Sequence, residues 1–261
     1  MKMSIVLEVA LMSLIPLISV LIALILGQRY GEYSIKKSPE LQQSAVGSVV
    51  GAVFGLLAFI LAFTFQIAVS HYDSRKSKLL EEVTDIRTTY LRAGLIDEPI
   101  CSGTKKLLVE YVDQRVELTR DFSKLGPILS RSQQILDTLW SYAEILAKRD
   151  RSSEVYALYI SSVNDLVDNY NQRVTVVLEY RIPVTVFYVL YVILFFSMFV
   201  LGYQFGISGK GSFKINVLMA LIFAAVMFLI TALDRTETGL VKINQKPLYT
   251  LQDQLHDKQA P

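Results

Sequence analysis

The chain has 261 residues, 52% of them hydrophobic, with a mean hydropathy of +0.40 and a formal net charge of +2. This is too apolar for an ordinary soluble domain, and the small net charge is not that of a nucleic-acid-binding protein. Cys101 is the only cysteine, which excludes an internal disulfide and any cysteine-based metal site. No HExxH, P-loop or GxSxG pattern occurs. We therefore expect no enzyme activity, no catalytic or metal-binding residue and no cofactor.

Four apolar stretches are long enough to cross a bilayer, whose core needs about 20 apolar residues per helix. They are residues 4–27, 45–69, 183–206 and 215–233. The first is too long for the core of a signal peptide, and no Ala-x-Ala-like site follows it. We predict four transmembrane helices in two hairpins, which occupy residues 1–70 and 183–234.

The second span carries one face of small and polar residues. At about 100° per residue, the small and polar residues fall within a single arc of the helix or directly beside it. In chain order the residues of the arc are Ser44, Ser48, Gly51, Gly55, Ala62, Gln66 and Asp73, and Phe59 and Ser70 flank it. Polar groups at membrane depth normally face a partner or a cavity, so this face is the most informative part of the chain.

Two interpretations of this face stay open. Gly47, Gly51 and Gly55 form a GxxxGxxxG run, which favours close helix packing. Alternatively, the face lines a water-filled path in which Phe59 or Phe63 forms a hydrophobic constriction that gates by dewetting. The predicted lining is Ser48, Gly51, Gly55, Phe59, Phe63, Gln66 and Ser70, with Asp73 and Arg75 as a charged ring at the cytoplasmic mouth.

The 112 residues from 71 to 182 hold 33 of the 50 Lys, Arg, Asp and Glu residues. We interpret this segment as a soluble domain inserted between the two hairpins. Its apolar residues recur at spacings of three and four, which is typical of amphipathic helices in a bundle. Breaks at 97–103, 126–127 and 150–153 divide it into four helices, of which the first continues the second span. Residues 235–261 are expected to form a short tail.

The predicted side of the membrane for this domain depends on which positive charges are counted. Arg75, Arg173 and Arg181 lie close to the membrane within the domain and join Lys2 near the N-terminus. Their balance favours a cytoplasmic domain with cytoplasmic termini, whereas the short loops alone give nearly a tie.

The chain also resembles a known family. The stretches that carry the resemblance are FTFQIAVSHYDSRKSKLLEEVTDIRTTYLRAGLI, LGYQFGISGK and LIFAAVMFLITALDRTETGLVKINQKPLYTL. They resemble the bacterial membrane proteins grouped as bestrophin-like, over most of the chain from the second span onward. The Tyr-Asp-x-Arg pattern that begins at Tyr72 and the closing LDRTETGLVKINQKPL are the more specific parts.

The resemblance implies a distant similarity to bestrophins, which are homopentameric and mainly anion-conducting channels. In those proteins the second of four spans lines the pore with apolar constrictions that often bear Phe. The chain lacks the Arg-Phe-Pro-type signature and the acidic calcium-binding run near the C-terminus, so calcium gating is not implied. The proposed stripe has no Lys or Arg ring, and Asp73 favours cations.

We therefore expect an all-α protein of the bacterial inner membrane that forms a homo-oligomeric ion channel. Its expected partners are further copies of the chain (a pentamer, from the resemblance alone), membrane lipids and inorganic ions, with no nucleic acid. The alternative is a sensor or scaffold whose four-helix domain binds a ligand or partner outside the cell. Partners would then have to supply the output, because the tail is too short for a signalling domain.

Overall fold

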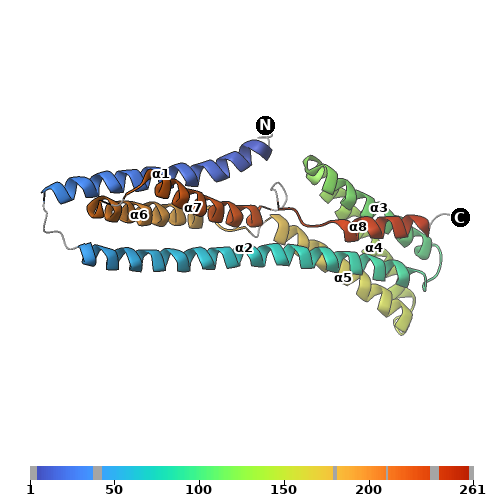
Figure 1. Cartoon of the computed structure of the whole chain (residues 1–261). Coiled ribbons are helices and arrows are strands. Elements are labelled where there is room, and N and C mark those ends of the chain that lie inside the picture. The colour runs from blue at the N-terminus through green and yellow to red at the C-terminus, as the bar shows by residue number, and fades with distance from the viewer. Residues whose placement is uncertain (1–4, 38–42, 179–180, 210, 236–240, 259–261) are drawn as a thin grey trace. The chain divides into compact units, whose positions relative to one another are not determined.

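A computed structural model describes residues 5–37, 43–178, 181–209, 211–235 and 241–258. Side chains are described from residue 14 onward in the first range, from 46 to 176 in the second, and throughout the other three. Every regular element in these ranges is a helix (Figure 1), which confirms the all-α prediction. The helices are α1 (Ile5–Lys37), α2 (Gln43–Ala93), α3 (Ile100–Arg120), the 3-10 helix η1 (Phe122–Lys124), α4 (Leu125–Arg149), α5 (Glu154–Leu178), α6 (Val184–Ser208), α7 (Phe213–Asp234) and α8 (Lys246–Asp257).

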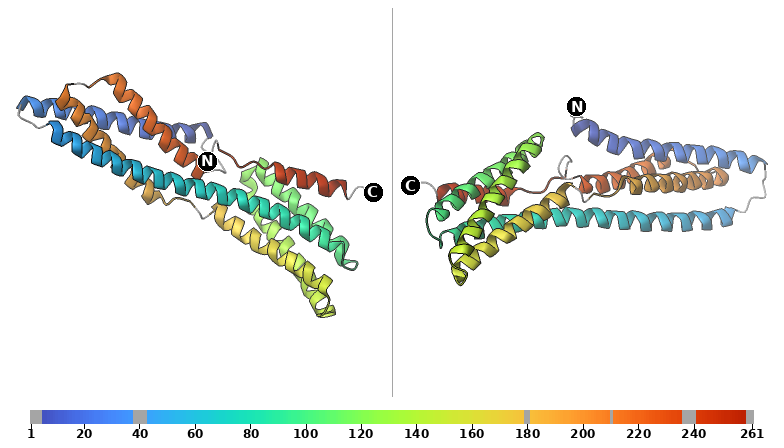
Figure 2. Two further views of the ribbon diagram at one scale, coloured as in Figure 1. Left: turned by 60° about the horizontal axis from the view of Figure 1, so that its bottom comes forward. Right: turned by 180° about the vertical axis from the view of Figure 1, so that it is seen from behind.

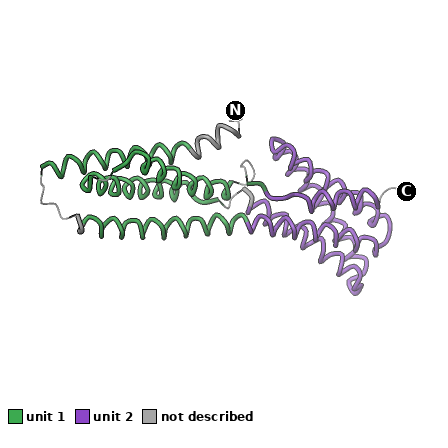
Figure 3. Tube along the Cα trace, in the orientation of Figure 1, with its two compact units in different colours: residues 1–72, 181–242 green, residues 73–180, 243–261 purple. Residues whose placement is uncertain are grey.

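The chain divides into two compact units (Figure 3). Unit 1 comprises residues 1–72 and 181–242, and unit 2 comprises residues 73–180 and 243–261. Helix α2 contributes to both as one unbroken helix of 51 residues, so the predicted continuation of the second span into charged sequence is confirmed. No Pro lies within α2, and no Gly lies between Gly55 and its end, so nothing in this stretch interrupts the helix.

Unit 1 holds the apolar helices. Four helices have the length and composition to cross a membrane, namely α1 from Leu14, α2 from Val46, α6 and α7. The predicted first span begins before the described residues, and α1 continues beyond its predicted end to Lys37. Helices α6 and α7 lie along α1 (Figures 1 and 2), and their core includes Leu24, Leu57, Leu194, Met198 and Met227.

Glycines bring the backbones of α1 and α6 into direct contact. A Cβ atom on Gly27 would lie 2.0 Å from the carbonyl oxygen of Phe199, and one on Gly202 would lie 2.3 Å from that of Leu24. Gly31 and Gly206 have equally little room, with backbone oxygens at 2.3 and 2.2 Å. Small residues four positions apart on both helices therefore form a close contact between the two backbones.

Unit 2 is built around a core drawn from α2, α3, α4, α5 and α8. Leu79 and Ile86 of α2 pack with Leu108 of α3, Leu139 of α4 and Leu166 of α5. The break predicted at 150–153 agrees with the end of α4 at Arg149 and the start of α5 at Glu154. The other two breaks lie earlier than predicted, because α3 begins at Ile100, immediately after Pro99, and Gly126 and Pro127 lie in the first turn of α4. At the start of α5, Ser153 Oγ accepts the N–H of Tyr156 at 3.3 Å, which caps the helix.

The expected tail contains a helix that the sequence interpretation missed. Helix α8 buries Leu248, Leu251 and Leu255 in the core of unit 2, and its N–H groups begin their helical bonds at the carbonyl of Gln245. The spacing of these leucines is three and four, and Pro247 stands in the first turn. Both signals are present in the sequence, but the segment is short enough to be overlooked.

Candidate functional site

Helix α2 has a buried face and an exposed face within unit 1. Val50, Leu57, Leu61, Thr64 and Ala68 are buried, and on a helix they project in one direction. The seven predicted lining residues (Ser48, Gly51, Gly55, Phe59, Phe63, Gln66 and Ser70) are all classed as exposed in the single chain. At about 100° per residue they project to the side of α2 opposite the buried face.

The glycines of this exposed face have little packed against them in the described residues. A Cβ atom on Gly51 or Gly55 would meet no heavy atom within 4 Å, and one on Gly47 would meet only the side-chain nitrogen of Gln204, at 3.3 Å. Close packing within one chain is therefore the role of the α1 and α6 glycines. The GxxxGxxxG run of α2 presents a smooth, unoccupied surface.

Two aromatic rings stand on the same face one turn apart. Phe59 and Phe63 are 60% and 59% exposed, and their ring centroids are 4.7 Å apart with the planes tilted by 53°. Phe54 on the other side of α2 instead packs edge-on against Phe223 of α7, with the centroids 6.1 Å apart. Phe59 and Phe63 thus stand exposed beside each other, whereas Phe54 packs on α7.

The structure separates the two charged residues expected at the mouth. Asp73 is exposed and follows the polar face, whereas Arg75 is only 1% exposed. Residues two positions apart on a helix project about 200° apart, so they cannot share a face. Of the two residues predicted for the mouth, only Asp73 is exposed beside the polar face.

A buried carboxylate at the end of α7 joins three parts of unit 1. Asp234 at the end of α7 is buried, and its Oδ1 accepts the backbone N–H of Ile182 at 3.0 Å. The same oxygen lies 3.3 Å from Nδ1 of His71 on α2. Asp234 thereby ties the segment before α6 to α2 and α7, a role that only the folded chain reveals.

A second unpredicted cluster lies in unit 2. Glu82 of α2 is 0% exposed and forms ion pairs with Arg115 of α3, at 3.1 Å from Nε, and with Arg173 of α5. The hydroxyl of Tyr111 donates to the same carboxylate at 2.7 Å. The only sequence signal is that Glu82 and Arg115 occupy positions beside the apolar stripes of their helices.

Burial shifts the pKa of two members of this cluster, Tyr111 and Arg173. Burial raises the pKa of the Tyr111 phenol, which therefore stays protonated and donates to Glu82. Burial lowers the pKa of Arg173 to about 10, still far above neutral pH. Two guanidinium groups consequently share one buried carboxylate, which holds α2, α3 and α5 together.

The family model described as a bestrophin-like domain matches residues 14–248. No curated protein matches. One variant of a bacterial bestrophin homolog from Klebsiella pneumoniae gives a TM-score of 0.68 at 14% identity, with 95% of this chain and 100% of that chain covered.

A second variant of that homolog gives a TM-score of 0.66 at 14% identity, with 97% of this chain and 100% of the other covered. At such low identity the structural likeness shows the fold alone. The family match spans most of the chain, and the apolar helices identify a multi-pass membrane protein. The chain therefore belongs to the bestrophin-like family.

Proposed function

We propose that this protein is a homo-oligomeric ion channel in which the exposed face of α2 lines the ion path. The observation that carries the proposal is the unpacked polar face: a Cβ atom added to Gly51 or Gly55 would meet no heavy atom of another described segment within 4 Å, and Gln66 is exposed in a membrane-type helix. An amide at membrane depth is costly unless it meets water or a partner. A cyclic oligomer repeats the same face around its axis, which would supply Gln66 with both water and neighbouring copies of the chain.

Within this path, Phe59 and Phe63 would form the narrowest apolar section, and a ring of Asp73 would lie at one mouth. Repeated around an axis, two layers of exposed Phe rings make a hydrophobic constriction that passes ions only when it is wet. The face carries no Lys or Arg, and a ring of carboxylates favours cations. Five copies are favoured by the family resemblance alone.

Removing the aromatic rings is expected to increase the current. Phe59→Ala and Phe63→Ala should each raise single-channel conductance in planar bilayers by at least about two-fold, because a wider and less apolar section wets more readily. The matched control is Phe196→Ala on α6, a Phe that is also 60% exposed but stands on a different helix. It should leave conductance unchanged.

Two results would contradict the channel. One is the absence of current from purified protein at any salt concentration or voltage tested. The other is an equal change from Phe196→Ala and Phe59→Ala, since a general effect on lipid packing would then explain both. Size-exclusion chromatography should first show that all variants elute as the same oligomer.

We further propose that unit 2 and both termini lie in the cytoplasm of a bacterium, with unit 1 in the inner membrane. The distribution of Lys and Arg beside the spans supports this orientation. Alkaline phosphatase and green fluorescent protein fused at residue 130 and at the C-terminus should report it. Fluorescence with no phosphatase activity at both sites is expected, and phosphatase activity at residue 130 would favour the sensor interpretation instead.

A further inference from the structure

A groove of about 370 Å³ lies in unit 2 between α2 and the start of α8. Arg87 and Val83, one turn apart on α2, form one wall. The other wall comes from the segment before α8 and from its first turns. The residues on that side are Asn244, Lys246, Pro247, Thr250, Leu251 and Gln254.

The charge in this groove is entirely positive. Arg87 and Lys246 line it, and no carboxylate does. No Asp or Glu stands three or four positions from either residue, so neither cation has a partner on its own helix. Within the described part of the chain, neither side chain forms a hydrogen bond or an ion pair. Two positive side chains thus border one groove without neutralisation.

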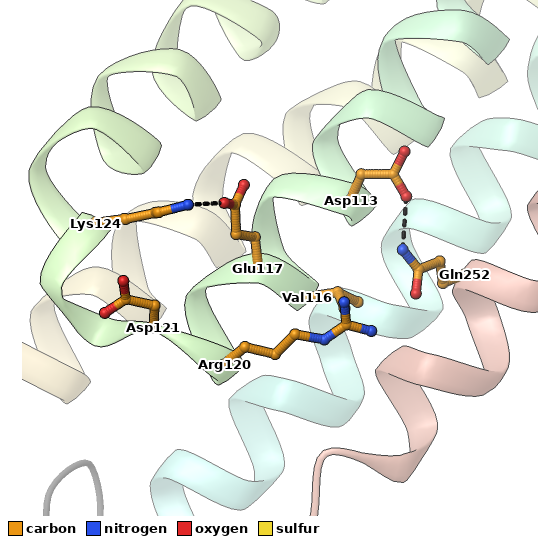
Figure 4. Close-up of a pocket in the computed structure, with 7 residues that line it drawn as sticks. All are labelled: Asp113, Val116, Glu117, Arg120, Asp121, Lys124 and Gln252. Atoms are coloured by element: carbon orange, nitrogen blue, oxygen red, sulfur yellow. Dashed lines mark hydrogen bonds and ion pairs between the residues drawn. The ribbon is translucent and has the colours of Figure 1, made fainter.

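A neighbouring cavity shows how unit 2 normally balances such charges. This cavity of about 450 Å³ has three carboxylates and two cations in its lining (Figure 4). Glu117 pairs there with Lys124, and Asp113 accepts from the amide of Gln252 at 2.7 Å. The groove beside Arg87 differs because it has the cations without the carboxylates.

Neutral donors complete the polar side of the groove. The Oδ1 atom of Asn244 accepts the backbone N–H of Lys246 at 2.9 Å, which leaves the NH₂ group of that amide to donate. The side chains of Thr250 and Gln254 supply further donors along the same face of α8. The N-terminal end of the α8 dipole adds to the positive potential.

The apolar part of the lining indicates that the ligand is more than a bare anion. Val83, Pro247 and Leu251 present hydrocarbon beside the cations, and the groove is larger than an inorganic phosphate requires. We propose that this groove binds a phosphomonoester, with its dianionic phosphate between Arg87 and Lys246 and its organic part against the apolar wall. Arg and Lys are the side chains that most often bind phosphate, as a fork and as a point charge.

Binding can be measured by calorimetry on the full chain in detergent at low salt. The probes are inorganic phosphate, glycerol 3-phosphate and AMP, and nanodiscs with and without phosphatidic acid test whether a lipid supplies the phosphate. Arg87→Gln and Lys246→Gln should each weaken binding about ten-fold or more, because each removes one charge-assisted contact. Arg120→Gln in the neighbouring cavity is the matched control and should leave the affinity unchanged.

Each outcome bears on the proposal. Binding of AMP or glycerol 3-phosphate that is lost in both groove variants supports a soluble ligand. Binding that occurs only with nanodiscs containing phosphatidic acid, and that both groove variants lose, also supports the groove and identifies a lipid as the source of the phosphate. No binding of any probe at millimolar concentration would overturn the proposal, as would binding that Arg120→Gln weakens as much as Arg87→Gln. Circular dichroism should show that the exposed substitutions leave the fold intact.

Discussion

Replacing Glu82 with glutamine is expected to lower the melting temperature of unit 2 by roughly 10–20 °C. The substitution keeps the size of the side chain but removes the carboxylate that Arg115 and Arg173 share. Removing one partner of a buried ion pair typically costs about 3–5 kcal/mol, because the remaining charge is left uncompensated. Here two guanidinium groups, those of Arg115 and Arg173, would be left without a counter-charge.

Trp140 offers a direct measurement of this effect. It is the only tryptophan of the chain and lies on α4 in unit 2, so its fluorescence reports the unfolding of that unit. Glu81→Gln is the matched control, because the adjacent carboxylate is exposed and pairs only with Lys78 and Ser77 on the same helix. Its melting temperature should stay within about 2 °C of the parent chain.

A triple variant separates charge from packing. Glu82→Leu combined with Arg115→Met and Arg173→Met removes every charge of the cluster at similar volume. Apolar replacements of a whole buried cluster are often neutral or stabilising, so most of the lost stability should return. If Glu82→Gln melted with the parent chain, or the triple variant melted lower than the single one, the buried-charge explanation would fail.

A single methyl group is expected to have opposite effects on α6 and on α2. Gly202→Ala should destabilise unit 1 by about 1–3 kcal/mol, because its Cβ would lie 2.3 Å from the backbone oxygen of Leu24 and would force α1 and α6 apart. Gly51→Ala and Gly55→Ala should be neutral or stabilising by up to about 1 kcal/mol, since they add a better helix former where nothing is near.

Thermal unfolding followed by circular dichroism, together with the yield of monodisperse protein, would test this pair. The same two α2 variants examined in planar bilayers connect stability with function. Under the proposed function they should reduce conductance while the fold remains intact, because the added methyl groups narrow the path. Equal destabilisation by Gly51→Ala and Gly202→Ala would show instead that the α2 glycines pack against a neighbouring copy.

The sequence alone was sufficient to predict the apolar helices and to place the small and polar residues of α2 on one face. A backbone that crosses a bilayer must satisfy its hydrogen bonds internally, so a run of about 20 apolar residues already implies a helix. The angular position of Gly51, Phe59 and Gln66 on that helix is likewise local geometry, fixed by 3.6 residues per turn. These properties depend on near neighbours in the chain.

The tertiary structure alone decided what each surface meets. The same spacing of glycines occurs at Gly27 and Gly31 on α1 and at Gly51 and Gly55 on α2, yet only the first pair touches another backbone. The partners of Glu82 lie 33 and 91 positions further along the chain. Close backbone contacts and buried ion pairs are set by how distant segments pack, and periodicity within one helix contains no information about them.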